Sequence, residues 1–103
     1  MIKVKYSRES VCMADDCVNR LMSYEMPDDT TLGELIARIR ETYVDDYSGI
    51  PYTGGGTRWI LTSNVGPLAN FCDSHESVPR YYTFTPNDLI KDLGITEVHG
   101  HRK

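Results

Sequence analysis

The sequence lacks long apolar runs, has little cysteine and has no excess of basic residues, and each shortage excludes a class of protein. No segment approaches the roughly 18 consecutive apolar residues of a membrane-spanning helix. The first residues, Met-Ile-Lys-Val-Lys-Tyr, alternate apolar and charged side chains and contain no apolar signal-peptide core. We therefore expect a cytoplasmic protein with no membrane partner.

Charge and cysteine content narrow the class further. The chain has 11 Lys and Arg against 15 Asp and Glu, a net charge of −4. A nucleic-acid-binding protein needs a basic face for phosphate contacts, so we predict no nucleic-acid partner. Three cysteines are an odd number, which favours reduced thiols over a secreted disulfide framework. A length of 103 residues suffices for one hydrophobic core, so we predict a single domain over residues 1–103.

Hydrophobic periodicity predicts a definite order of strands and helices. Ile2, Val4 and Tyr6 alternate with polar residues, as in a half-buried strand. Further strands are expected at 18–26, 57–63, 68–72 and 95–101, and residues 81–84 either add a short strand or pack aromatic rings over an open edge. Residues 44–56 contain Pro51 and three successive glycines, so we predict a loop there.

The main helix has the strongest signal. Thr31 followed by Glu34 is a capping box. One apolar stripe recurs at helical spacing: Leu32, Leu35, Ile36, Ile39 and Tyr43. A second, short helix is predicted to start at Thr85-Pro86 and to stop at Gly94.

Two of these segments resemble ubiquitin-like domains. Asp29-Thr30-Thr31-Leu32-Gly33-Glu34-Leu35, which follows a hairpin, resembles the start of their main helix. Asp88-Leu89-Ile90-Lys91-Asp92-Leu93-Gly94-Ile95, ahead of Val98, resembles the helical turn before their last strand. The resemblance implies an α+β chain with the β-grasp fold, in which one main helix and a short second helix accompany a mixed sheet of four to five strands. Val11-Cys12-Met13-Ala14-Asp15-Asp16 and Gly55-Gly56-Thr57-Arg58-Trp59 also resemble small uncharacterised bacterial proteins, a likeness that implies no activity.

Two chemistries of β-grasp proteins are not expected here. Ubiquitin-like modifiers and sulfur carriers end in a Gly-Gly tail, whereas this sequence ends Gly100-His101-Arg102-Lys103. Plant-type ferredoxins hold their iron–sulfur cluster with Cys-x4-Cys-x2-Cys and a distant fourth cysteine. Cys12 and Cys17 have the first spacing, but Arg20 occupies the third position and the chain has only three cysteines. We expect no such cluster.

Zinc is the one metal that the side chains suggest. Three thiolates and one imidazole form a common tetrahedral ligand set for zinc. The sequence supplies these groups in Cys12, Cys17, Cys72 and His75. The alternative is that Cys12 and Cys72 are small strand hydrophobes and that His75 is a loop residue. The expected fold separates the first and fourth strands, so a shared ion would require the first hairpin to curl across the sheet. Apart from zinc we expect no cofactor.

The loop at 44–56 is the candidate partner-binding segment. Asp45, Asp46, Tyr47 and Tyr52 make it acidic and aromatic, and tyrosine is enriched at protein interfaces. The alternative is that both tyrosines fold inward as additional core. Trp59 has the same parity as Leu61, so we predict that it lies in the core.

No catalytic motif links the cysteines and histidines. Glu97, His99 and His101 share one strand face, which allows a weak metal site or a polar edge. We therefore expect a small non-catalytic interaction or adaptor module that binds an unidentified protein through the open sheet face or the 44–56 loop, as a monomer or an edge-strand dimer. The alternatives are a zinc-stabilised domain, and a small-ligand binder or enzyme of unknown type.

Overall fold

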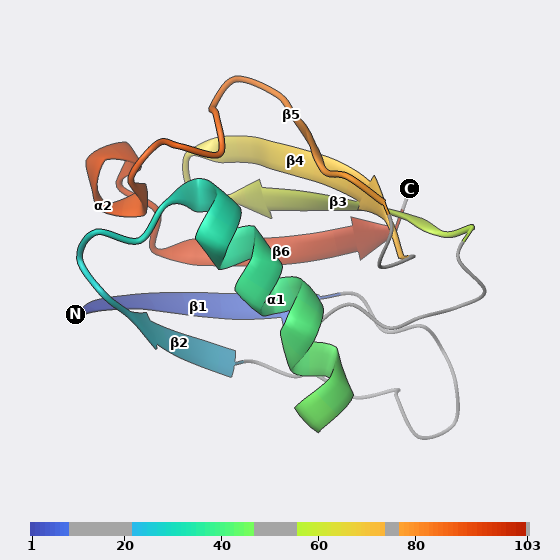
Figure 1. Ribbon diagram of the computed structural model, residues 1–103, viewed down its shortest axis with the longest axis horizontal. Helices are drawn as coiled ribbons and strands as arrows, with labels where there is room; N and C mark the ends of the chain where they lie inside the picture. The colour runs from blue at the N-terminus through green and yellow to red at the C-terminus, as the bar shows by residue number, and fades with distance from the viewer. Residues whose placement is uncertain (9–21, 47–55, 74–76, 103) are drawn as a thin grey trace.

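The computed structural model describes residues 1–8, 22–46, 56–73 and 77–102, which form six strands and two helices (Figure 1). In chain order the elements are β1 (Ile2–Arg8), β2 (Met22–Met26), α1 (Leu32–Asp46), β3 (Arg58–Ser63), β4 (Gly66–Cys72), β5 (Arg80–Tyr81), α2 (Ile90–Leu93) and β6 (Glu97–Arg102). The predicted α+β class is confirmed. Neither helix in this part of the chain is long and apolar enough to cross a membrane.

The six described strands form one mixed sheet with the order β2-β1-β6-β3-β4-β5. β1 and β6 are parallel, and every other neighbouring pair is antiparallel. The sheet has one strand more than the four to five that we predicted, because Arg80–Tyr81 pairs with β4 at Ala69 and Asn70. Tyr81 and Phe84 pack against the core and hold this short segment beside β4.

The core lies between α1 and one face of the sheet (Figure 1). Side chains alternate along a strand, so each strand contributes every second residue to this face. The buried side chains include most of those predicted from periodicity: Val4, Tyr6, Leu32, Leu35, Ile36, Ile39, Trp59 and Leu61. Tyr24 and Val98 are buried as well. The prediction that Trp59 belongs to the core is confirmed, since its exposed fraction is 0%.

The start of α1 uses all of its first amide groups. The Thr31 amide donates to Glu34 Oε1 over 3.0 Å, and the Glu34 amide donates to Thr31 Oγ1 over 3.2 Å, which confirms the capping box. The two amides between Thr31 and Glu34 donate to carbonyls of the segment that precedes α2. The Leu32 amide donates to the Asp88 carbonyl over 2.8 Å, and the Gly33 amide donates to the Pro86 carbonyl over 3.0 Å. These bonds join the two helix-bearing segments and orient α1 on the sheet.

The same bonds explain why α2 starts later than the sequence suggests. We predicted a helix from Thr85-Pro86, but α2 spans only Ile90–Leu93. The Thr85 amide donates to Asp88 Oδ2 over 2.9 Å, so this segment is a turn instead of a helix start. The Pro86 and Asp88 carbonyls accept amides of α1 and are not used within a longer α2. The predicted stop is confirmed, because Gly94 adopts the left-handed conformation with φ 74°.

Candidate functional site

The sheet face opposite α1, called here the open face, carries the polar side chains. On β1, β3 and β6 the residues that alternate with the buried ones are exposed or half-buried. They are Lys3, Lys5, Ser7, Arg58, Ile60, Thr62, Glu97, His99 and His101. No described helix covers this face (Figure 1).

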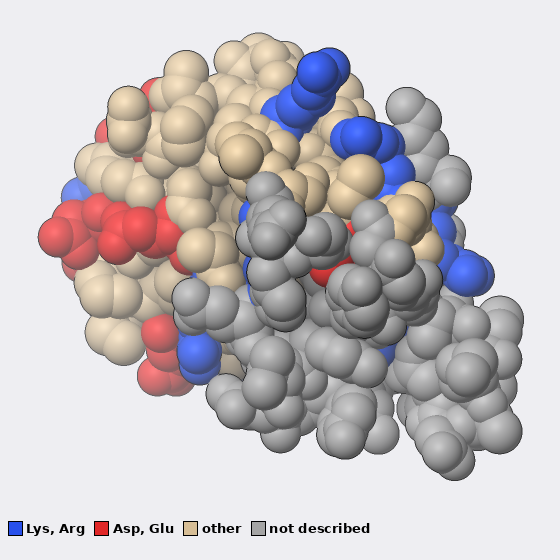
Figure 2. All heavy atoms as spheres, turned by 45° about the vertical axis from the view of Figure 1, so that its right-hand side comes forward, with Lys and Arg blue, Asp and Glu red and all other residues tan. Residues whose placement is uncertain are grey.

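Charge is unevenly distributed over the molecule. In Figure 2 most of the visible Asp and Glu side chains lie at the left, and most of the visible Lys and Arg side chains lie at the upper right. At one end of the sheet, called here the basic end, β3 begins at Arg58 and β6 ends at Arg102, and Arg102 pairs with Trp59 in the β3–β6 register. The whole chain carries a net charge of −4, so the positive charge of the basic end is local.

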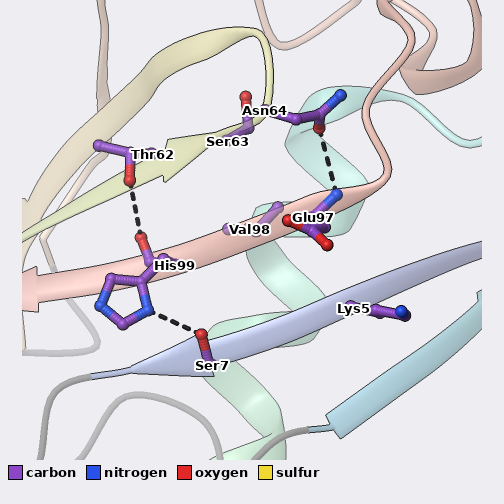
Figure 3. Close-up of a pocket in the computed structure, with 8 residues that line it drawn as sticks. All are labelled: Lys5, Ser7, Thr62, Ser63, Asn64, Glu97, Val98 and His99. Carbon is purple, nitrogen blue, oxygen red and sulfur yellow. Dashed lines mark hydrogen bonds between the residues drawn. The ribbon is translucent and has the colours of Figure 1, made fainter.

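A pocket of about 390 Å³ lies on the open face where β1, β6 and β3 run side by side (Figure 3). It is lined by Lys5, Ser7, Thr62, Ser63, Asn64, Glu97, Val98 and His99. Ligand pockets typically have volumes of about 300–1,000 Å³. This pocket falls within that range, but its lining is polar where most ligand sites are apolar.

A hydrogen-bonded row crosses the pocket from β1 to β3. Ser7 Oγ lies 2.7 Å from His99 Nδ1, and Thr62 Oγ1 lies 3.0 Å from His101 Nε2 (the first of these contacts is drawn in Figure 3). The rings of His99 and His101 meet edge to face, with their centroids 4.4 Å apart. The parallel register places Ser7 opposite His99, and the antiparallel register places Thr62 opposite the same residue. These bonds hold the imidazoles in fixed orientations.

A serine hydroxyl bonded to an imidazole is one half of a nucleophile–base arrangement. Acyl transfer also needs preorganised donors for an oxyanion. β6 pairs with β1 on one side and with β3 on the other. The backbone amides beside Ser7 and His99 therefore belong to the sheet's hydrogen-bond ladders instead of forming an oxyanion site. The geometry in the described residues thus supports binding better than catalysis.

Asn64 forms one end of the pocket and joins the β3–β4 turn to the start of β6. Its Oδ1 accepts from the amides of Thr96 (2.9 Å) and Glu97 (3.2 Å), and its Nδ2 donates to the Gly94 carbonyl over 2.9 Å (Figure 3 shows the bond to Glu97). Asn64-Val65-Gly66-Pro67 has the residue types of a turn. The partners of Asn64 lie 30 or more positions away, so no local pattern indicates them.

We expect Asn64→Ala to lower the free energy of unfolding by about 1–3 kcal/mol, because the amides of Thr96 and Glu97 and the Gly94 carbonyl lose their partner. Chemical denaturation measures the loss, and hydrogen exchange should quicken at Thr96 and Glu97. Asn87→Ala, in the exposed turn before α2, is the matched control and should change stability by no more than about 0.5 kcal/mol. Equal losses in both variants would contradict the role assigned to Asn64.

Three groups with shifted pKa values, Tyr6, Arg40 and Tyr81, pack against the core on the other side of the sheet. Burial raises the pKa of the Tyr6 hydroxyl well above its usual value. Burial also lowers the pKa of Arg40, whose guanidinium lies 4.8 Å from the centre of the Phe71 ring, and raises that of Tyr81. All three shifts follow from packing against the core, and none belongs to the pocket.

The predicted partner-binding residues are only partly within the described chain. We predicted a loop from Val44 onward, but α1 continues to Asp46. Asp45 and Asp46 therefore belong to the last turn of this helix. The first glycine or proline after Tyr43 is Gly49, and therefore no helix breaker lies at Val44. The side chains of Asp45 and Asp46, and all of Tyr47 and Tyr52, lie outside the described residues.

Of the four predicted zinc ligands, the structure describes only Cys72. It is a free, half-buried cysteine at the end of β4, and its amide donates to Ser77 Oγ over 2.9 Å. Cys12, Cys17 and His75 lie outside the described residues. Within the described part of the chain, no three His, Cys, Asp or Glu side chains are close enough to hold a metal ion. β6 and β3 separate β1 from β4, as the expected fold requires.

Comparison of the chain with protein-family models, with curated proteins and with solved structures found no match.

Proposed function

We propose that this protein is a non-catalytic interaction module of the cytoplasm with a β-grasp (ubiquitin-like) fold, and that it binds another protein through the open face of its sheet. The strand order supports the fold assignment. A β1–β2 hairpin leads into α1, and the last strand, β6, returns between β1 and β3 and runs parallel to β1.

The observation that carries the functional proposal is a second hydrogen-bonded row on the open face. Arg58 donates to Asn70 Oδ1 over 2.6 Å, and Asn70 Nδ2 donates to the Tyr82 hydroxyl over 3.0 Å. Tyr82 remains 46% exposed, and Arg80 lies opposite Asn70 in the β4–β5 register. Arginine and tyrosine are the residue types that most often dominate binding energy at interfaces. Held in place across β3, β4 and β5, these side chains form a preorganised basic and aromatic surface suited to an acidic partner.

Affinity capture with matched variants tests the proposal. We expect Arg58→Ala/Tyr82→Ala to lose partners that the wild-type chain captures, because both anchors of the row are removed. Tyr47→Ala/Tyr52→Ala tests the alternative surface at 44–56. Arg38→Ala, an exposed arginine of α1 above the Tyr24 ring, is the control for loss of one positive charge on the helix side.

If the open-face variant and the wild type recover the same partners, the open face is not the recognition surface. If only the Tyr47→Ala/Tyr52→Ala variant loses partners, recognition belongs to the 44–56 segment.

The pocket favours a second candidate function, the binding of a small ligand, because it brings polar side chains of three neighbouring strands together.

A further inference from the structure

Two opposite charges lie side by side at one end of the pocket without pairing with each other. The β1–β6 register places Lys5 directly opposite Glu97, and both side chains are exposed members of the pocket lining. Within the described part of the chain, Lys5 and Glu97 form no ion pair with each other. Figure 3 shows them on adjacent strands at the same end of the pocket, with Asn64 beyond Glu97.

We propose that this pocket binds the zwitterionic head of a free α-amino acid. The ammonium group of Lys5 and the hydroxyl of Ser7, which lie on the same strand face, donate to the carboxylate, with His99 Nδ1–H donating to Ser7 Oγ so that the hydroxyl proton is available. The carboxylate of Glu97, on the neighbouring strand, receives the ammonium group. The assignment rests on the small-ligand function of the pocket and is independent of a protein partner.

The charge balance of the pocket selects this ligand class. A simple anion would be attracted by Lys5 but repelled by Glu97. A simple cation would be attracted by Glu97 but repelled by Lys5. A molecule with both charges a few atoms apart satisfies both side chains at once. Charge-assisted hydrogen bonds of this kind are stronger than neutral ones, so each end contributes to binding.

The walls of the pocket are held before a ligand arrives. The Ser7–His99 bond fixes the β1 side, and Asn64 fixes the backbone at Glu97. Preorganisation reduces the entropy that binding must offset. Val98 is the only lining residue with a wholly apolar side chain, and we expect weak binding, roughly millimolar.

A titration of the isotope-labelled full chain, followed by amide NMR shifts, tests the proposal with glycine as the probe. Acetate and methylammonium carry one charge each and serve as single-charge probes. We expect saturable shifts at Ser7, Glu97 and His99 with glycine, and affinity lower by about tenfold or more for either single-charge probe. Lys5→Gln and Glu97→Gln should each weaken glycine binding by about tenfold as well.

The chain offers a matched control pair on the same face. Lys3 lies opposite Glu25 in the β1–β2 register, and neither residue lines the pocket. Lys3→Gln and Glu25→Gln make the same changes in net charge and should alter the affinity by less than about twofold. Unperturbed spectra elsewhere show that each variant is folded.

Three results would overturn the assignment. If glycine produces no saturable shift at these residues, the pocket is not a zwitterion site. Equal affinity for acetate and glycine would make it an anion site. Equal weakening by Lys3→Gln and Lys5→Gln would indicate attraction by net charge alone. None of these results bears on the Arg58–Tyr82 surface, which the capture experiment tests separately.

Discussion

Replacing Trp59 with alanine is expected to lower the free energy of unfolding by about 3–5 kcal/mol. Trp59 is the largest of the fully buried side chains and points from β3 into the core under α1. Its indole Nε1 has no hydrogen-bond partner in the described residues, so the loss comes from burial and from the cavity left behind. Small domains are stable by only about 5–15 kcal/mol, so a loss of this size removes a large share of the total stability.

Circular dichroism in a urea titration measures the loss, since Trp59 is the only tryptophan and its fluorescence disappears with it. Ile60→Ala is the control on the adjacent residue, which faces the open side and is half-buried. We expect it to cost about 1 kcal/mol or less. Similar losses at the two positions would contradict the assignment of inward and outward faces on β3.

Gly100→Ala is expected to destabilise the fold by about 1–3 kcal/mol. Alanine within a strand is ordinarily more favourable than glycine by roughly 0.5–1 kcal/mol, so the expected sign is reversed. A Cβ atom at this position would lie 3.2 Å from the Tyr6 hydroxyl oxygen and 3.3 Å from Arg8 Cβ. Gly100 faces the core from β6, where β1 approaches in parallel register, and the neighbouring side chains have little room to withdraw.

A double-mutant cycle with Tyr6→Phe tests this packing. The Tyr6 hydroxyl is buried without a hydrogen-bond partner in the described residues, so Tyr6→Phe alone should be close to neutral. In the Gly100→Ala background it removes one of the two close contacts and should restore part of the stability, with a coupling of about 0.5–1 kcal/mol. Purely additive losses would show that Tyr6 is not the residue that excludes a larger side chain.

The local features of this fold were accessible from the sequence because they depend on neighbouring residues. The alternation in β1 identified Val4 and Tyr6 as buried, and the capping box placed the start of α1 to the residue. Gly94 ended α2 as expected, because only a residue that tolerates a left-handed backbone closes a helix in this way. In each case the residues that form the hydrogen bond or the buried face are within a few positions of one another in the sequence.

Two of the differences from the predictions involve a contact between distant segments. The start of α2 moved from Pro86 to Ile90 because the carbonyls of Pro86 and Asp88 accept amides of α1. The sixth strand arose from two residues beside β4. The residues at 81–84 had indicated either a short strand or aromatic packing over an edge, but which of the two forms depends, like the start of α2, on how α1 and the sheet pack together.

By itself the sequence determined the class of the fold, the main helix with its cap, and which residues of β1 and β3 face the core. Only the tertiary structure decided where the polar site lies. Ser7 and His99 are 92 positions apart, and Lys5 and Glu97 are brought opposite each other by the parallel pairing of β1 with β6. A strand's periodicity specifies which face a side chain occupies, whereas the register with a distant strand follows from packing of the whole core.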